Sequence, residues 1–171
     1  MIATGRTALM QQAWDVLEAI PDPEIPVVSI RELGILREIN DCDGQLQVVI
    51  TPTYSGCPAM GQIEDDVRAA LAANGLPGTV VTRLAPAWST DWIAAAAREK
   101  LRAFGIAPPH ALPATKVVRF APPAAVAVAA VPCPHCGSHD TTQTSHFSST
   151  ECKALYKCLR CLEPFDYFKP Y

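Results

Sequence analysis

The sequence predicts a small α+β domain with a mixed sheet, followed by a four-cysteine zinc-ribbon module. Three observations predict this class. Apolar residues at the start of the chain recur first at helical and then at strand-like spacing. Prolines and alanines then crowd the stretch 107–130, and two Cys-x-x-Cys pairs follow it. We therefore expect an α+β domain over 1–106, a Pro/Ala-rich linker over 107–130 and a zinc ribbon over 131–171.

Composition and charge exclude several classes of protein. The chain has 171 residues, of which 49% are hydrophobic and 18% are charged, so it suits one ordinary domain with a small module. A net charge of −3 excludes a strongly basic nucleic-acid binder. Neither a signal peptide nor an apolar run long enough to cross a bilayer is visible. We expect a cytoplasmic protein without nucleic-acid or membrane partners, in which clustered cysteines are metal ligands or reactive thiols.

The first half of the α+β domain is predicted from apolar spacing. Apolar residues predict a helix over 7–20, which three prolines end. Two strands are predicted over 30–39 and 46–51. The dipeptide Asp43-Gly44 joins them, because it supplies the positive φ of a tight hairpin.

The second half adds a helix, a strand and a helix. The next helix is predicted to begin near Pro58, and an Asn-Gly pair closes it. A third strand is predicted over 79–85, and Ser89 or Thr90 is expected to cap a third helix. The order helix, hairpin, helix, strand, helix indicates the mixed sheet. A short strand over 116–120 is predicted within the linker.

The two Cys-x-x-Cys pairs are the strongest motif. Each such turn points two thiolates at one ion, and two turns supply the four soft ligands that tetrahedral zinc prefers. About forty residues bury too little core to fold alone, so a metal would contribute much of the folding free energy. We expect structural zinc, with a rubredoxin-like iron site or a redox dithiol as alternatives. The ligands would be Cys133, Cys136, Cys158 and Cys161.

The rest of the ribbon is less specific. Cys152 is a small apolar residue, a reserve ligand or a functional thiol, and His135 is a bystander once four cysteines complete the site. Four basic residues balance four acidic ones beyond residue 130, so the electrostatic attraction that dominates nucleic-acid binding is lacking. The aromatic tail 163–171 indicates a protein-contact surface, or rings that cover a small core.

A second site is predicted at Cys57. Pro58 suits the first position of a helix, which puts Cys57 at or beside its N-cap. Free amides and the positive end of the helix dipole favour a thiolate there. Cys57 is therefore a candidate nucleophile or soft metal ligand, and the alternative is a buried structural cysteine.

A stiff, acidic loop is the other candidate. It carries Asp22 and Glu24 among three prolines. One interpretation places these carboxylates near Cys57, as a hard ligand or a proton acceptor. The other is a solvated turn that Asp22 caps. No phosphate-binding glycine loop and no Ser/His/Asp arrangement accompany them, so nothing in the sequence supports a self-contained enzyme.

These residues resemble two known families. The segments Asp22-Pro-Glu-Ile-Pro, Leu33-Gly34 and Thr51-Pro-Thr-Tyr-Ser-Gly-Cys57-Pro resemble the SufT-like iron–sulfur maturation proteins over about residues 9–104. The C-terminal stretch, from Cys-Pro-His-Cys-Gly to Glu-Pro-Phe-Asp-Tyr-Phe-Lys, is similar to the PaaD family. That family is encoded with the phenylacetyl-CoA epoxidase of aerobic phenylacetate degradation.

The resemblance implies a function. The family's reactive cysteine falls on Cys57, and its acidic loop falls on Asp22 and Glu24. The epoxidase combines a di-iron oxygenase with a reductase that carries flavin and a [2Fe–2S] cluster, and PaaD-like proteins help to mature one of these iron centres. The resemblance thus implies a non-enzymatic accessory protein with the oxygenase and reductase subunits as partners.

Iron or an iron–sulfur cluster would be its transient cargo. Because one thiolate cannot hold a cluster, a homodimer, a partner or a small thiol must supply the other ligands. Two alternatives stay open: a non-catalytic scaffold that joins the epoxidase components, and a direct electron-transfer subunit.

Overall fold

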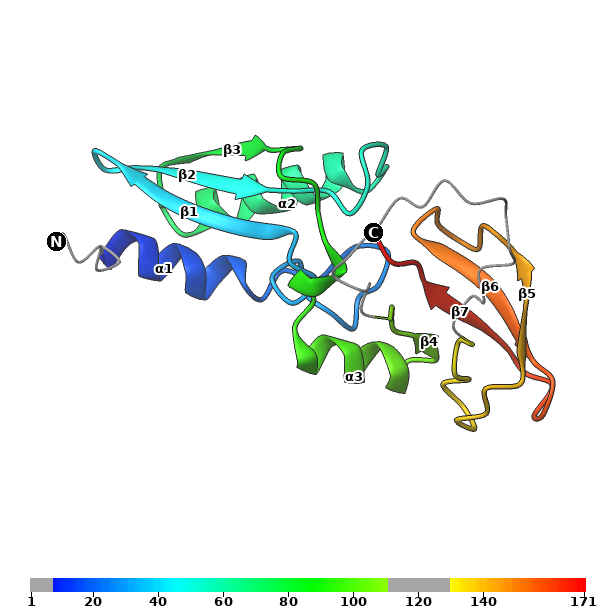
Figure 1. Cartoon of the computed structure of the whole chain (residues 1–171). Coiled ribbons are helices and arrows are strands. Elements are labelled where there is room, and N and C mark those ends of the chain that lie inside the picture. The colour runs from blue at the N-terminus through cyan, green and yellow to red at the C-terminus, as the bar shows by residue number, and fades with distance from the viewer. Residues whose placement is uncertain (1–7, 111–129) are drawn as a thin grey trace, which may run out of the picture. The chain divides into compact units, whose positions relative to one another are not determined.

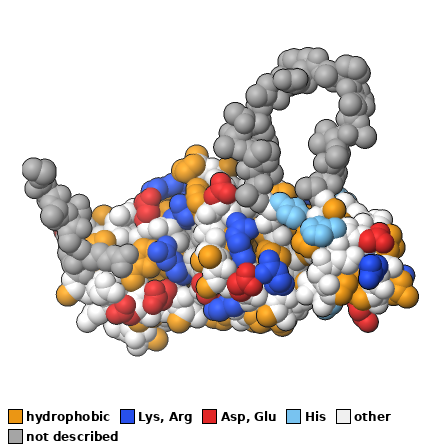
Figure 2. All heavy atoms as spheres, turned by 60° about the horizontal axis from the view of Figure 1, so that its bottom comes forward, with side chains coloured by type: hydrophobic (Ala, Val, Ile, Leu, Met, Phe, Trp, Pro, Cys, Tyr) orange, Lys and Arg blue, Asp and Glu red, His pale blue; other side chains and the backbone are white. Residues whose placement is uncertain are grey.

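The computed structural model describes residues 8–110 and 130–171. The chain divides into two compact units, Met1–Lys100 and Leu101–Tyr171, and Figure 1 shows the order of their elements. No helix of the described residues is long and apolar enough to cross a bilayer. Figure 2 shows basic and acidic side chains interspersed on the face that it draws.

The first unit holds a three-stranded sheet and helices. In chain order its elements are α1 (Ala8–Leu17), β1 (Leu36–Cys42), β2 (Gln45–Ile50), α2 (Met60–Ala73), β3 (Gly78–Thr82), a 3₁₀ helix (Thr90–Trp92) and α3 (Ala95–Ala103), which continues into the second unit. The strands follow the order β1-β2-β3. β1 and β2 are antiparallel, whereas β2 and β3 are parallel, so the predicted mixed sheet is confirmed. Helix α2 supplies the crossover that a parallel pair requires.

The apolar side chains that recur along α2 form part of the core of this unit. Ile63, Val67 and Leu71 are buried on one side of α2, while Leu46 and Val48 are buried on β2. Each fully buried aliphatic side chain contributes about 1.5–3 kcal/mol relative to an exposed one. Helix α1 packs against β1 and α2.

Two predictions near the start of the chain need correction in their bounds. Helix α1 ends at Leu17 rather than at Ile20, because the Ile20 amide already closes a turn on the Leu17 carbonyl (3.2 Å). The strand predicted from Ile30 begins only at Leu36. Residues 30–35 form turns instead, and their apolar side chains are buried there.

The other element predictions differ in smaller ways. The hairpin turn is confirmed, with φ of 54° at Asp43 and 84° at Gly44. Ser89 caps the 3₁₀ helix by accepting from the Asp91 amide (3.2 Å), and α3 follows only at Ala95. The strand predicted over 116–120 lies outside the described residues.

The second unit is built on a four-stranded sheet. Its strands are β4 (Ile106–Ala107), β5 (Thr141–Ser145), β6 (Lys153–Cys158) and β7 (Pro164–Phe168), in the order β4-β7-β6-β5. β4 runs parallel to β7, and the other pairs are antiparallel. Tyr156 and Tyr167 meet edge to face with ring centroids 5.5 Å apart, in a small core that also buries Phe165. These three aromatic residues thus form one core of the ribbon.

Candidate functional site

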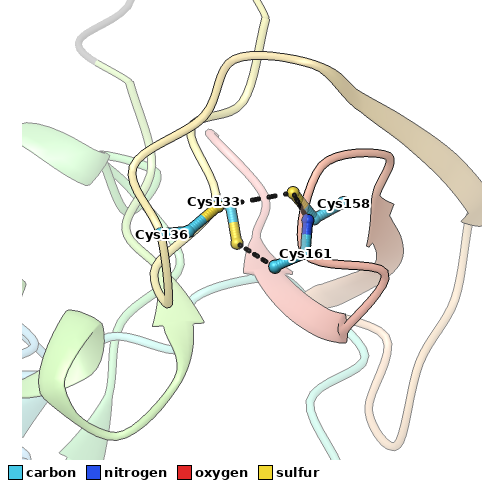
Figure 3. A group of neighbouring side chains, drawn as sticks. All are labelled: Cys133, Cys136, Cys158 and Cys161. Carbon is cyan, nitrogen blue, oxygen red and sulfur yellow. Dashed lines mark hydrogen bonds between the residues drawn. The ribbon is translucent and has the colours of Figure 1, made fainter.

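The four predicted ligands come together in the second unit. The first pair lies in the turn before β5, and the second runs from Cys158, the last residue of β6, into the turn before β7. Figure 3 shows the four side chains converging from these two turns. The Sγ atoms of Cys133 and Cys161 are 3.7 Å apart, those of Cys136 and Cys158 are 3.6 Å apart, and all four lie within 4.8 Å of one another.

These distances suit a tetrahedral thiolate site. With Zn–S bonds of about 2.3 Å, two sulfurs of a regular tetrahedron are about 3.8 Å apart. The two closest pairs of sulfurs match that edge. The four-cysteine zinc-ribbon fold predicted from the sequence is therefore confirmed, and its four thiols lie close enough to hold one ion.

Two of the thiols, those of Cys158 and Cys161, have pKa values shifted in opposite directions. The Cys161 amide donates to the Cys158 Sγ at 3.5 Å. This hydrogen bond is the largest of several, with the Arg160 amide and the neighbouring thiols, that lower the pKa of the Cys158 thiol to about 6. The Glu163 amide lowers the pKa of Cys161, but burial and the neighbouring thiols outweigh it and raise that pKa to about 12. A cation would remove this conflict, because it stabilises all four thiolates together.

Two other residues of the ribbon, Cys152 and His135, lie outside the four-thiol group. Cys152 is buried, and its Sγ lies 3.0 Å from the Thr150 hydroxyl. His135 is exposed in the turn of the first pair. Neither belongs to the group of four thiols.

Cys57 lies in the first unit, where α2 begins. The N-cap is Ala59, so Cys57 precedes the N-cap by two residues rather than standing at or beside it. The Cys57 amide donates to the Tyr54 carbonyl (3.2 Å), and the Cys57 carbonyl accepts from the Met60 amide (3.3 Å). Two consecutive turns therefore hold the backbone of Cys57, and its side chain is half-buried.

Asp22 fixes the shape of the acidic loop. It is only 6% exposed, and its Oδ1 accepts from the amides of Glu24 (2.9 Å) and Ile25 (2.8 Å). The Asp22 amide donates to the Val28 carbonyl at 2.9 Å, which closes the loop. Asp22 thus caps a turn, as one of the two interpretations of the sequence had it, but the cap is buried rather than solvated.

The structure does not assemble these three residues into one ligand set. Among residues 8–110 and 130–171, the four ribbon cysteines form the group of metal-ligating side chains, and Cys57, Asp22 and Glu24 do not form another. Glu24 is half-buried, like Cys57. A metal held at Cys57 would therefore need ligands from elsewhere.

The sequence interpretation gave no reason for the step Leu33-Gly34. In the structure, the Trp88 indole N–H donates to the Leu33 carbonyl at 3.0 Å, and the Ala94 amide donates to the Glu32 carbonyl at 2.9 Å. The segment after β3 is thereby tied to the turn before β1. The role of Leu33-Gly34 therefore depends on contacts with residues more than fifty positions later in the sequence.

Two known domains match the chain. Residues 10–85 match the iron-sulfur cluster assembly protein family, and residues 123–169 match the PaaD zinc beta ribbon domain. A crystal structure of a domain of unknown function, DUF59, from Bacillus anthracis superposes with a TM-score of 0.51 at 31% identity. It covers 55% of this chain and 92% of that chain, and it supports the fold of the first unit.

Curated relatives cover the same two parts. The Fe-S protein maturation auxiliary factor YitW of Bacillus subtilis (strain 168) is 35% identical over 86 residues, which are 50% of this chain and 81% of the relative. A protein of Escherichia coli (strain K12), named as the D component of 1,2-phenylacetyl-CoA epoxidase, is 45% identical over 171 residues, 98% of this chain and 97% of its own. Because this second similarity runs through both parts at nearly full length, the chain belongs to the PaaD family of phenylacetyl-CoA epoxidase components.

Proposed function

We propose that this protein is a non-enzymatic accessory protein that helps to assemble or insert iron or an iron–sulfur cluster in phenylacetyl-CoA epoxidase. Cys57 is the transient ligand, and the oxygenase or reductase of the epoxidase is the client. Work is divided between a cargo domain over 1–106 and a ribbon over 131–171, with a linker over 107–130. The ribbon sheet also takes in β4 at the junction of the first domain and the linker.

The observation that carries this proposal is the setting of Cys57. Its backbone is held by two turns at the entrance of α2, and its thiol stays half-buried rather than sealed in the core. A thiol held in this way can meet a ligand from outside while the loop keeps its shape. The similarity of this part of the chain to an Fe-S protein maturation auxiliary factor supports the same role.

The ribbon is assigned a structural metal. A site with four cysteine ligands offers no open position, which is typical of structural zinc rather than of a site that exchanges its metal. Zinc held there would stabilise the fold of the ribbon. Iron in transit is therefore assigned to Cys57.

The acidic loop assists in this proposal. Asp22 holds the backbone of the loop through its buried cap, and Glu24 is the half-buried carboxylate of the same loop. Because a cluster needs more than one thiolate, a client cysteine, a small thiol or a second copy of the chain completes the ligand set.

The experiment compares Cys57→Ser with Cys42→Ser. Cys42 is exposed at the end of β1, so its substitution controls for the loss of a thiol. Each variant is co-expressed with the epoxidase components, and the iron content of the purified components is measured. We expect Cys57→Ser to keep about one zinc per chain and its fold while client iron falls, and Cys42→Ser to behave as the wild type. Client iron that is unchanged in Cys57→Ser contradicts the proposal.

A second candidate function is a scaffold that joins the epoxidase components without handling iron. Exposed leucines on the ribbon, Leu159 and Leu162, favour it, because they indicate a docking surface. Unchanged client iron in Cys57→Ser, together with retained binding of the components, would select the scaffold. A visible absorption band of iron in the ribbon would instead select direct electron transfer.

A further inference from the structure

We infer that the turn Leu159-Arg160-Cys161-Leu162 is the surface by which the ribbon docks on a protein partner. The partner it fits presents an apolar depression with a carboxylate at the rim. That this partner is a component of the epoxidase rests on the proposed function.

The two cysteine turns share a backbone conformation but differ in sequence. Gly137 follows the second cysteine of one pair, and Leu162 follows the second cysteine of the other. Both residues have a positive φ, 73° at Gly137 and 67° at Leu162. This region of φ suits glycine, and a bulky side chain is strained in it. The same positive φ is thus occupied by glycine, which favours it, in the first turn and by leucine, which does not, in the second.

Folding does not explain the leucine. The Leu162 residue is 64% exposed, and Leu159 is 48% exposed. An exposed side chain gains little free energy from burial, so it does not offset the strain of its backbone. Glycine at position 162 would suit the isolated ribbon better, so the leucine serves an interaction outside the ribbon.

Arg160 lies between the two leucines in the sequence, and its guanidinium is available to bind a partner. Within the described parts of the chain, the Arg160 guanidinium makes no ion pair, hydrogen bond or ring contact. Such a contact is present at Arg31, Arg37, Arg68, Arg83 and Arg98, and Arg102 also has an interaction partner.

Charge indicates what Arg160 would meet. Arg160 lines a hollow of about 360 Å³ together with Cys136, Gly137, Ser138 and Cys161. The thiolates of Cys136 and Cys161 in this lining belong to the metal site, and none of the five residues is an aspartate or glutamate. No carboxylate of the hollow pairs with Arg160, so a carboxylate of a partner is the complementary group. One arginine flanked by two aliphatic side chains is the composition of a protein–protein anchor. A nucleic-acid backbone would need a larger set of cations than this turn offers.

The test separates strain from recognition. Leu162→Gly and Leu162→Asn relieve the positive φ and remove the apolar side chain, whereas Leu162→Met keeps an apolar side chain. Arg160→Ala is matched with Lys157→Ala, another exposed cation of the ribbon, and Leu162→Gly is matched with Leu84→Gly, an exposed leucine of the first unit. Full-length variants are bound to the immobilised oxygenase and reductase of the epoxidase, and Kd, zinc content and Tm are measured.

The expected pattern is specific. Leu162→Gly and Leu162→Asn keep their zinc, melt at the wild-type temperature or above, and bind about tenfold more weakly. Arg160→Ala binds about fivefold more weakly, while Leu162→Met, Lys157→Ala and Leu84→Gly stay within about twofold. A merely structural role of Leu162 would lower Tm and zinc content instead.

Two results overturn the inference. One is wild-type affinity in Leu162→Gly and Arg160→Ala with zinc retained. The other is a wild-type protein that binds neither component. Both are separable from the proposed function, which stands or falls on client iron in Cys57→Ser. A Cys57→Ser protein that docks normally but leaves the client without iron would support both statements.

Discussion

A Cβ on Gly34 would lie 2.6 Å from the Cβ of Trp92 and 2.9 Å from its carbonyl oxygen. The Arg37 guanidinium covers the ring of the same tryptophan, with its central carbon 3.4 Å from the ring centroid. The tryptophan is thus held by the start of β1 and by the turn that precedes it. The close approach requires glycine, and φ of 73° at Gly34 requires it a second time.

The first prediction concerns Gly34→Ala. The methyl group would force the backbone of Trp92 away, so we expect a loss of about 3 kcal/mol of unfolding free energy. Gly44→Ala is the matched control, because Gly44 also has a positive φ (84°) but nothing within 4 Å of its Cβ position. The control should lose only about 1 kcal/mol. Urea unfolding measures both, and equal losses would mean that φ rather than the Trp92 contact sets the cost.

Asp22 gives a prediction about its cap. Asp22→Ala leaves the amides of Glu24 and Ile25 without their acceptor, which should cost about 2 kcal/mol. Asp22→Asn keeps an amide oxygen at the same place and should cost less than half as much. Urea unfolding of the two variants checks this.

The same pair of variants tests the charge of Asp22. If the carboxylate also assists Cys57, Asp22→Asn lowers client iron although its stability is nearly intact. Equal destabilisation by alanine and asparagine would show that the charge rather than the hydrogen bonds holds the loop.

The sequence could predict those features whose causes are local. The Cys-x-x-Cys turns set the direction of two thiols each, and Asp43-Gly44 sets the hairpin. The apolar residues of α2 set its buried side. These signals are complete within a few residues, so the four-thiol site and the mixed sheet were predictable.

What the sequence could not predict depends on distant partners. The stretch 30–35, with apolar residues at Ile30, Leu33 and Ile35, looks like part of a strand. It turns instead, because the Trp88 indole donates to the Leu33 carbonyl and Trp92 packs closely on Gly34. Nothing in the local pattern indicates tryptophans more than fifty residues away. The positive φ of Leu162 could not be predicted either, because leucine rarely adopts this conformation and the local sequence does not signal it.

Metal removal gives the third prediction. A chelator that strips the four cysteines should unfold the ribbon, because its small core cannot hold four strands alone. Amide protons of β5, β6 and β7 should lose their protection against exchange, while those of β2 and α2 keep it. Cobalt(II) added to the stripped protein should give the intense absorption of a tetrahedral tetrathiolate site. A metal-free ribbon that keeps its protected amides would contradict a folding role for the metal.

A fourth prediction concerns pH. The Thr82 hydroxyl donates to Glu64 at 2.6 Å and, with Arg68, lowers the pKa of that carboxyl from its ordinary value. A lowered folded-state pKa stabilises the fold above the unfolded pKa, and this contribution is lost as pH falls through the folded value. Thr82→Val should therefore cost about 1 kcal/mol near pH 7 and distinctly less near pH 3.

Thr79→Val is the control for that experiment. Thr79 is exposed on the same strand, so the substitution makes the same change of β propensity away from Glu64. Its effect should be independent of pH. A cost of Thr82→Val that is the same at both pH values would mean that Thr82 acts through packing alone.

The last prediction concerns a buried lysine of the ribbon. Lys153 is 5% exposed, and its Nζ lies 3.5 Å from Asp166, which also accepts from the Ser148 hydroxyl. Asp166→Asn leaves a buried ammonium without its counter-charge and should cost about 3 kcal/mol. Lys153→Met in the same chain removes that ammonium, so the double variant should be more stable than Asp166→Asn alone. A double-mutant cycle by urea unfolding measures the coupling. If the costs of the two single substitutions add within about 0.5 kcal/mol in the double variant, the two side chains are not coupled. The Lys153 side chain would then extend far enough for its ammonium to be hydrated, and the pair would orient β6 and β7 without stabilising them.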